Sequence, residues 1–371
     1  MLTAARSDTP ASLPNTLPAE FYTSIARFDE DIEHIFYDSW VCCGRAEKIG
    51  RPGQFFVQPI GRESVIVLRD RQGEARAFYN VCRHRGTRMC TDTAGQFPNS
   101  IQCPYHAWTY GLDGRLIGAP HMEETPDFDK ATYPLYEVAV TEWEGFLYAN
   151  LSAEPEPFAE IYAPLMNKFA AWQLPRLKIG GRVDYDVQAN WKLIVQNYSE
   201  CYHCPGVHPA LARLSPYRSG NNDLVEGQFL GGSMDILHEA GSMTLSGRAC
   251  AAPIGEVAGE ALSKVYYYSL FPNTLLSLHP DYVMLHTLWP QGPARTLITC
   301  EWLFEPEAMA APGFDAQDAV GFWDMTNRED WHMCELSQLG ISSRAYRPGP
   351  YSRLERVPAA FDRYYLSRIE R

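Results

Sequence analysis

The chain has 371 residues, of which 46% are hydrophobic and 21% charged, a balance typical of a globular protein with room for two domains. A formal net charge of −13 disfavours a protein that binds nucleic acid or docks on an anionic membrane. Residues 1–18 lack the apolar core of a secretory signal, and no run of about 18 apolar residues occurs, so we expect a cytoplasmic protein with no membrane association.

The pattern of apolar residues predicts an α+β fold in two unequal parts. Apolar residues recur at helical intervals over 19–40. Short strands separated by glycine turns are predicted over 54–58, 64–68, 75–81 and 145–151. Pro155 and Pro157 then mark a boundary. Beyond it, helices are predicted over 158–173, 191–204 and 315–339, and strands over 283–289 and 297–304.

Two short motifs lie among the predicted strands, and each pairs a cysteine with a histidine. The first is Cys82-Arg83-His84, and the second is Cys103-Pro104-Tyr105-His106. Two thiolates on one iron and two imidazoles on the other form a Rieske-type [2Fe–2S] centre. Gly86 and Pro104 suit loops that close over such a cluster.

A structural zinc site is the alternative, since zinc also binds two cysteines and two histidines. Zinc modules usually group cysteine with cysteine and histidine with histidine, whereas each motif here mixes the two ligand types. We therefore favour the iron–sulfur cluster. The other eight cysteines show no spacing typical of a disulfide scaffold, and we expect them to be free thiols in a reducing compartment.

A second group of potential ligands lies at Glu200, His203 and His208. Two imidazoles and one carboxylate on one face of an iron leave positions open for dioxygen. Pro205 and Gly206 break a regular helix and could turn His208 back towards His203. The alternative is that both histidines are ordinary polar residues, but their spacing on a chain with a redox cluster favours iron.

Together, these motifs resemble the catalytic α-subunit of Rieske non-haem iron oxygenases. The resemblance rests on Cys82-x-His84, Cys103-x2-His106 and Glu200-x2-His203-x4-His208, with Asn190-Trp191-Lys192 upstream, and it covers nearly the whole chain. It implies a β-rich Rieske domain and a catalytic domain with an antiparallel sheet flanked by helices. On this basis we expect an N-terminal helical segment over 1–45 packed on the catalytic domain, a Rieske domain over 46–152 and a catalytic iron domain over 153–371.

The resemblance further implies that His203 and His208 bind a mononuclear Fe(II) with a carboxylate near the C-terminus. The candidates are Asp324, Glu329, Asp330 and Glu335. The family pattern D-x4-E-x2-Q fits Asp330, followed by Glu335 and Gln338, so Asp330 is the predicted ligand and Asp324 the runner-up.

Glu200 occupies a position that is most often Asp in ring-hydroxylating members. In the family this carboxylate bridges the cluster and the iron of neighbouring subunits, which would join His203 to His106 of an adjacent chain. A glutamate here, within Glu200-Cys201-Tyr202-His203-Cys204, resembles the branch that acts on quaternary ammonium compounds such as choline, glycine betaine, carnitine and stachydrine.

Aromatic side chains in the C-terminal half could form a cage for a quaternary ammonium group, because ring faces attract a cation. The candidates are Tyr266, Tyr267, Tyr268, Tyr282, Trp289, Phe322, Trp323 and Trp331. Most such side chains pack in cores instead. Trp323 and Trp331, which flank Asp330, are the predicted cage residues. His279, His286 and His332 could contact substrate, but ordinary hydrogen-bonded core or surface roles are favoured.

We therefore predict a mono- or dioxygenase that hydroxylates or N-demethylates a small quaternary ammonium substrate. Hydroxylation of an aromatic ring or acid is the alternative within the family. A Rieske electron carrier without substrate chemistry is a third hypothesis, but it would not need the second ligand group. No GxGxxG fingerprint is present, so NAD(P)H would act only through a separate reductase. A homotrimer follows from the resemblance alone.

Overall fold

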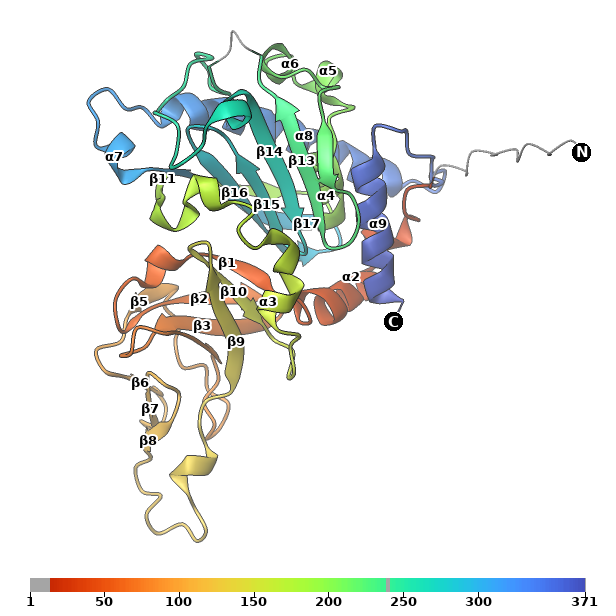
Figure 1. Cartoon of the computed structure of the whole chain (residues 1–371). Coiled ribbons are helices and arrows are strands. Elements are labelled where there is room, and N and C mark those ends of the chain that lie inside the picture. The colour runs from red at the N-terminus through yellow and green to blue at the C-terminus, as the bar shows by residue number, and fades with distance from the viewer. Residues whose placement is uncertain (1–13, 238–240, 371) are drawn as a thin grey trace, which may run out of the picture.

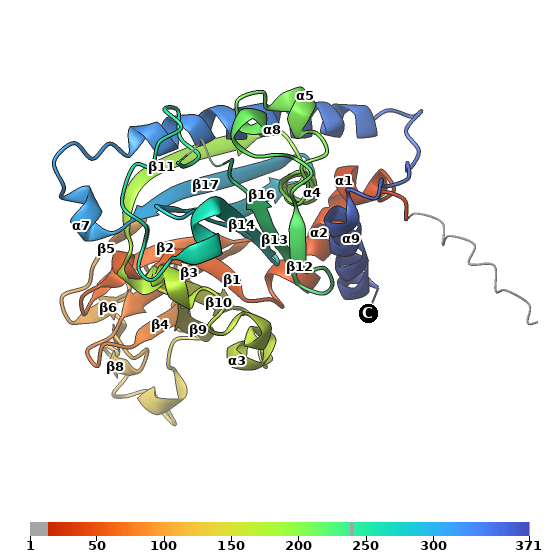
Figure 2. The ribbon, with the colours of Figure 1, turned by 45° about the horizontal axis from the view of Figure 1, so that its top comes forward.

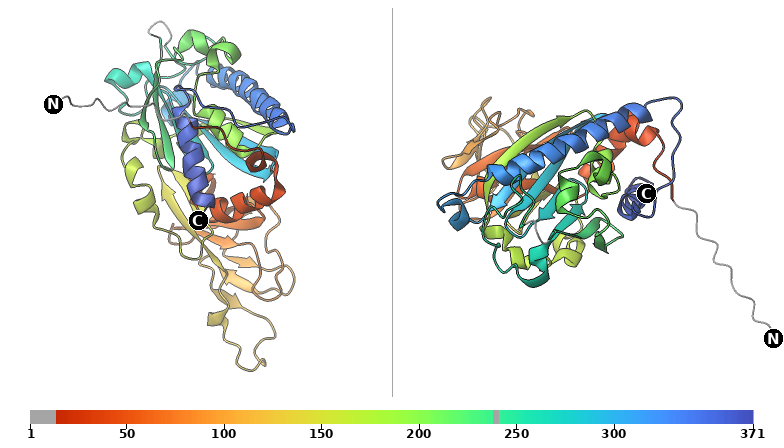
Figure 3. Two further views of the ribbon diagram at one scale, coloured as in Figure 1. Left: turned by 90° about the vertical axis from the view of Figure 1, so that its right-hand side faces the viewer. Right: turned by 90° about the horizontal axis from the view of Figure 1, so that it is seen from above.

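The computed structural model describes residues 14–237 and 241–370, which form two seven-stranded antiparallel sheets and a small three-stranded sheet (Figure 1). The first half of the chain is rich in strands and forms a narrow end of the molecule (Figure 3). Residues 178–304 supply the strands of the second seven-stranded sheet, and long helices lie beside it. The predicted α+β fold is confirmed.

The first sheet has the strand order β1-β10-β9-β4-β3-β2-β5. Its strands are β1 (Val41–Arg45), β2 (Gln54–Ile60), β3 (Glu63–Arg69), β4 (Ala75–Tyr79), β5 (Ala94–Gln96), β9 (Glu137–Trp143) and β10 (Phe146–Asn150). In β3, Val65 and Val67 face one hydrophobic cluster while Ile66 and Leu68 face another. Both faces of this strand are therefore buried.

The small sheet β6-β7-β8 lies at the narrow end of the molecule. Its strands are β6 (Ser100–Gln102), β7 (Thr109–Gly111) and β8 (Leu116–Gly118). The turn between β6 and β7 carries Cys103 to His106. The other cysteine–histidine motif, Cys82 to His84, follows β4. Both predicted cluster motifs therefore lie in loops at the ends of strands.

The second sheet has the order β11-β17-β16-β15-β14-β13-β12. Its strands are β11 (Lys178–Val187), β12 (Asn221–Leu224), β13 (Phe229–Asp235), β14 (Lys264–Leu270), β15 (Thr274–Leu278), β16 (Val283–Gly292) and β17 (Arg295–Phe304). The strands predicted at 283–289 and 297–304 correspond to β16 and β17.

Helices α4 (Trp191–Tyr198) and α8 (Gln317–Ile341) lie over one face of the second sheet (Figure 2). Helix α9 (Arg356–Ile369) lies beside the N-terminal helices α1 (Glu20–Thr23) and α2 (Ile25–Asp31). The remaining α-helices are one turn long: α3 (Phe158–Ile161), α5 (Cys204–Val207), α6 (Leu211–Leu214) and α7 (Pro306–Met309).

A buried polar cluster joins the N-terminal segment to α4 and α9. Asp31 accepts hydrogen bonds from Trp191 Nε1 (2.9 Å) and Tyr365 Oη (2.8 Å), and it pairs with the Lys192 ammonium. Asp31 and Lys192 side chains are both 0% exposed, so each charge depends on the other for compensation. These contacts fix the start of α4, whose far end leads to the site described below.

Three predicted helices differ from the structure. The helix over 19–40 is broken at Ser24, continues as a π-helix over Ile32–Phe36 and gives way to β1. The helix over 158–173 is one α-turn followed by two short 3-10 turns, because Pro164 and the positive φ of Asn167 interrupt it. The helix over 191–204 ends at Tyr198, before the predicted metal ligands.

Candidate functional site

Helix α4 ends just before the second predicted metal site. Asn190 caps the helix by accepting a hydrogen bond from Lys192 N (3.0 Å). After Tyr198 the chain leaves the helix and forms a loop that carries Glu200 and His203. The single turn α5 then contains Pro205 and Gly206 and ends at His208. This turn brings the second histidine back towards the first.

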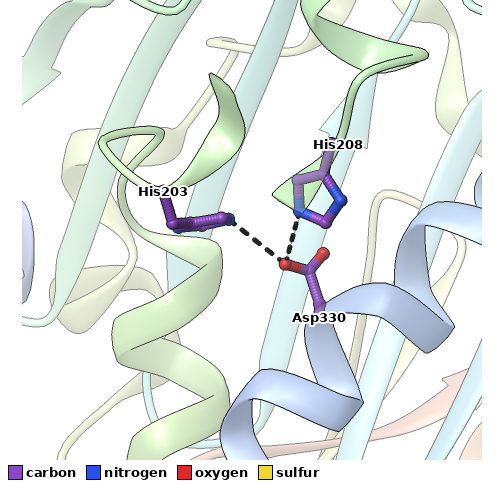
Figure 4. Close-up of side chains that lie close together, drawn as sticks. All are labelled: His203, His208 and Asp330. Carbon is purple, nitrogen blue, oxygen red and sulfur yellow. Dashed lines mark hydrogen bonds and ion pairs between the residues drawn. The ribbon is translucent and has the colours of Figure 1, made fainter. Parts of the chain in front are cut away.

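His203, His208 and Asp330 lie together, with one ligand atom from each within 4.8 Å of the others (Figure 4). Nε2 of His203 lies 3.2 Å from Asp330 Oδ1, and Nε2 of His208 lies 2.8 Å from the same oxygen. The carboxylate comes from α8 and the histidines from the segment after α4. Two imidazole nitrogens and a carboxylate oxygen converging on one point fit the donor set of a mononuclear iron.

The charges of this group stabilise one another. Burial lowers the pKa of His203, but hydrogen bonds to Asp330 and Glu200 outweigh it and raise the pKa to about 10. Burial also lowers the pKa of His208, but its contacts with Asp330 and Glu329 outweigh this effect and raise the pKa. Burial opposes ionisation of Asp330, yet the two imidazoles hold its pKa below the usual value. A dication would replace the protons that these histidines hold.

The other ring nitrogen of each histidine contacts a second carboxylate. Glu200 Oε1 lies 2.6 Å from His203 Nδ1, and Glu329 Oε2 lies 2.7 Å from His208 Nδ1. Such outer carboxylates fix the orientation of a ligating imidazole and increase its basicity. The structure therefore places Glu200 beside His203 although the two residues are not on one helix.

The other carboxylates considered as ligands point elsewhere. Asp324 accepts a hydrogen bond from Tyr185 Oη (2.9 Å) and pairs with Arg328. Glu335 accepts one from Gln188 N (3.0 Å). Both side chains hold neighbouring segments of the fold, so Asp330 is the one carboxylate among the candidates that meets both imidazole Nε2 atoms.

The predicted free thiols require one correction. Cys201 and Cys204 form a disulfide across the loop that carries His203, with Cα atoms 5.0 Å apart. The other six cysteines predicted to be free thiols are free, and the two predicted cluster ligands, Cys82 and Cys103, form no disulfide either. A Cys-x-x-Cys pair in a tight loop brings its sulfurs together without any scaffold of spaced cysteines. Spacing typical of secreted scaffolds was therefore the wrong criterion for this pair.

A cavity of about 390 Å³ opens beside the His203, His208 and Asp330 group. Trp323 and Trp331, the predicted cage residues, both line it from α8. Tyr198 and Tyr267 also line it, and sequence reasoning missed Tyr198. The Tyr267 ring lies 5.9 Å from that of Tyr198 and 6.3 Å from that of Trp323, in each case near perpendicular.

The alternation of side chains along β14 puts Tyr267 on the opposite face of the strand from Tyr266 and Tyr268. Tyr266 and Tyr268 belong to or pack against a different hydrophobic cluster, whereas Tyr267 faces the cavity. The sequence alone does not say which side of the strand meets α8. Tyr198 sits at the end of α4, one residue before the loop that carries Glu200.

The three additional histidines have different surroundings. His332 is exposed on α8. His279 and His286 are buried, as expected for core residues, and the ring nitrogens of His279 have no hydrogen-bond partner among the described residues. Burial lowers the pKa of His279 to about 3 and that of His286 to about 4. His286 lines the cavity.

The four predicted cluster ligands lie together at the narrow end of the molecule. Cys82 and Cys103 are buried, whereas His84 and His106 reach the surface with their ring centroids 4.7 Å apart. Burial raises the pKa of the Cys103 thiol. Tyr110 Oη lies 3.5 Å from Cys82 Sγ. Two inner sulfurs and two outer imidazoles suit the ligand set of a Rieske cluster, which Cys82, Cys103, His84 and His106 would hold.

Comparisons with known proteins identify both domains of the chain. The model of the Rieske [2Fe-2S] domain matches residues 39–134, and the ring hydroxylating alpha subunit (catalytic domain) model matches residues 174–371. Among the described residues, no helix has the length and apolar character to cross a bilayer.

Several relatives span nearly the whole chain. The glycine betaine monooxygenase oxygenase subunit of Chromohalobacter salexigens is 33% identical over 95% of this chain and 86% of its own. The carnitine monooxygenase oxygenase subunit of Escherichia coli is 31% identical over 90% of this chain and 86% of its own. A solved structure of the quaternary ammonium Rieske monooxygenase CntA with L-carnitine shares 25% identity and 97% of both chains at a TM-score of 0.78. The chain therefore belongs to the ring-hydroxylating alpha subunit family, in which a Rieske [2Fe–2S] domain accompanies a catalytic domain for mononuclear iron.

Proposed function

We propose that this protein is an oxygenase that hydroxylates or N-demethylates a small quaternary ammonium compound. The observation that carries the proposal is the cavity that places aromatic side chains beside the His203, His208 and Asp330 group. The names of the relatives, which are glycine betaine, carnitine and choline monooxygenases, support the same substrate class.

In this proposal, His203, His208 and Asp330 hold the iron, and Cys82, His84, Cys103 and His106 hold the cluster. When bound, the two centres supply the electrons and the dioxygen chemistry, which no side chain of the chain can provide. Asp330 and the outer carboxylates Glu200 and Glu329 keep both imidazoles oriented.

Glu200 is the proposed link between redox centres. Its side chain is 12% exposed and contacts His203, whose own side chain is 19% exposed, so both groups reach the surface of this chain. His106 is half-buried at the far end of the same chain. A neighbouring subunit whose His106 docks near Glu200 would complete a short path, and we propose a homotrimer built in this way, fed by a separate NAD(P)H-dependent reductase. Its dependence on that cofactor pool favours a cytoplasmic location.

The proposed substrate contacts are Trp323 and Trp331, joined by Tyr198 and Tyr267. A quaternary ammonium group has no N–H to donate, so ring faces are its main source of attraction. Nε1 of Trp323 donates to Tyr282 Oη (2.6 Å), which fixes the indole plane. We assign the N-terminal segment to residues 1–45, the Rieske domain to 46–152 and the catalytic domain to 153–371; residues 1–13, 238–240 and 371 of these ranges lie outside the described part of the chain.

Product analysis tests the proposal. The protein with both iron centres, a surrogate reductase and NADH would receive glycine betaine, carnitine, choline and simple aromatic acids, with products identified by mass spectrometry. We expect a demethylated or hydroxylated ammonium product, with formaldehyde where a methyl group is lost. Oxygenated aromatic acids with unchanged ammonium compounds would contradict the substrate class and favour the aromatic alternative.

A further inference from the structure

The Cys201–Cys204 disulfide lies within the loop that carries the predicted iron ligand His203. Both cysteines line the cavity, and Cys204 Sγ lies 4.0 Å from His203 Nε2, the atom that faces Asp330. Cys204 is buried, whereas Cys201 is partly exposed. No other cysteine pair among the described residues forms a disulfide. Disulfides in reducing compartments are usually transient and serve catalysis or redox sensing.

The closed disulfide coincides with a particular arrangement of Glu200. One carboxylate oxygen contacts His203 Nδ1 at 2.6 Å, and the other accepts the backbone N–H of Tyr202, which lies between the two cysteines. Both oxygens are thus engaged inside the loop. A carboxylate that links two subunits needs an oxygen directed outward, to the imidazole of the neighbouring cluster.

We propose that Cys201 and Cys204 form a peroxide-responsive redox site whose closure withdraws Glu200 from the electron path and whose reduction returns it. The inference rests on the proposed bridging role of Glu200. Opening the disulfide lets the Tyr202 backbone move away from Glu200, which frees one carboxylate oxygen to face outward.

The chemistry balances with hydrogen peroxide as the oxidant. The Cys201 thiol, the more accessible of the two, attacks the O–O bond to give a sulfenic acid and one water. The Cys204 thiol then attacks the Cys201 sulfur, forming the S–S bond and releasing the second water. The two sulfurs lose two electrons in total and the peroxide gains them. A dithiol reductant reverses the step by thiol–disulfide exchange, with two electrons and two protons returned to the cysteines.

The test compares the two redox forms of the protein with both iron centres in place. One equivalent of hydrogen peroxide is added, and alkylation with mass spectrometry reports whether Cys201 and Cys204 have closed. Iron content and the cluster spectrum are recorded in both forms, so that damage to either centre is separated from closure. Stopped-flow absorbance then follows reoxidation of the reduced cluster on mixing with dioxygen and glycine betaine.

We expect closure of the disulfide to slow cluster reoxidation about tenfold or more. Removing a side chain that orients a metal ligand usually has an effect of this size. Tris(carboxyethyl)phosphine should restore the rate. A Cys201→Ser, Cys204→Ser double variant should show no peroxide effect, whereas Cys250→Ser, which alters a free thiol outside the cavity, should respond as the unaltered protein does. The single variant Cys201→Ser serves the same purpose if the double variant does not fold.

The inference is overturned if both cysteines stay open to alkylation after peroxide, or if the closed and open forms reoxidise the cluster at equal rates. Glu200→Gln separates this result from failure of the proposed function. If that variant is slow in both redox forms while the state of the disulfide has no effect in the unaltered protein, only the redox site is refuted. If Glu200→Gln transfers electrons at the unaltered rate, the bridging role and this inference fail together.

Discussion

Replacing Tyr267 with leucine tests whether the cavity recognises positive charge. The ring faces the cavity and lies between those of Tyr198 (5.9 Å) and Trp323 (6.3 Å), so it forms the middle of an aromatic wall. A desolvated cation–ring contact contributes about 2 kcal/mol. At about 1.4 kcal/mol per factor of ten, its loss weakens binding of a trimethylammonium compound by about 30-fold.

The assay is calorimetric titration of the iron-loaded protein with glycine betaine and with its uncharged-headgroup isostere, 3,3-dimethylbutanoate. The two ligands differ in the charge at the quaternary centre and have nearly the same shape. Tyr267→Leu should weaken the binding of glycine betaine by about 30-fold and the binding of the isostere much less. Tyr267→Phe should retain most of the affinity because it keeps the ring.

Tyr266→Leu is the matched control, since Tyr266 lies on the same strand but packs near Trp172, with ring centroids 5.2 Å apart, outside the cavity. The reasoning is refuted if Tyr267→Leu weakens both ligands equally, because the effect would then be one of shape and not of charge. It is also refuted if Tyr266→Leu and Tyr267→Leu have the same effect on glycine betaine.

Three further predictions concern stability and metal binding. Asp31→Asn leaves the Lys192 ammonium buried without a counter-charge, and we expect the free energy of unfolding to fall by about 3 kcal/mol in urea denaturation; an unchanged midpoint would show that the pair contributes nothing. Asp330→Asn should lose the mononuclear iron and keep the cluster iron in elemental analysis, while Glu335→Gln keeps both; full iron in the first variant would remove Asp330 from the ligand set. Fe(II) binding to the iron-free protein near pH 7 should release at least about one proton in calorimetry, because the pKa of His203 is raised to about 10 and that of the second imidazole is raised as well. Iron affinity should therefore increase as pH rises towards 10, and binding without proton release would contradict the assigned ligands.

The parts of the site that depend on short spacing could be predicted from the sequence. Each cysteine–histidine pair lies within one loop, so its residues are close in space whatever the rest of the fold does. His203 and His208 are similarly close, and Pro205 and Gly206 indicate the turn between them. The strands at 54–60 and 63–69 are indicated by glycine turns and β-branched residues.

Contacts between distant segments could not be predicted from spacing. Asp330 lies more than 120 residues after His203, and only the family resemblance singled it out among the carboxylates of α8. The direction in which Tyr267 points depends on which face of β14 packs beneath α8, and this is a tertiary property. The same holds for the buried polar cluster, which joins three distant segments through Asp31, Lys192 and Tyr365.

A single-turnover experiment tests the central claim most directly. The protein with both centres reduced, and then freed of reductase and reductant, is mixed with dioxygen and glycine betaine carrying deuterated methyl groups. The products are identified by mass spectrometry. The proposed function predicts deuterated formaldehyde and the demethylated amine, each in a molar amount comparable to that of the protein chain. This is expected because the protein itself holds the electrons, the dioxygen site and the substrate. Reoxidation of the cluster with no oxygenated product from glycine betaine, carnitine or choline would contradict it.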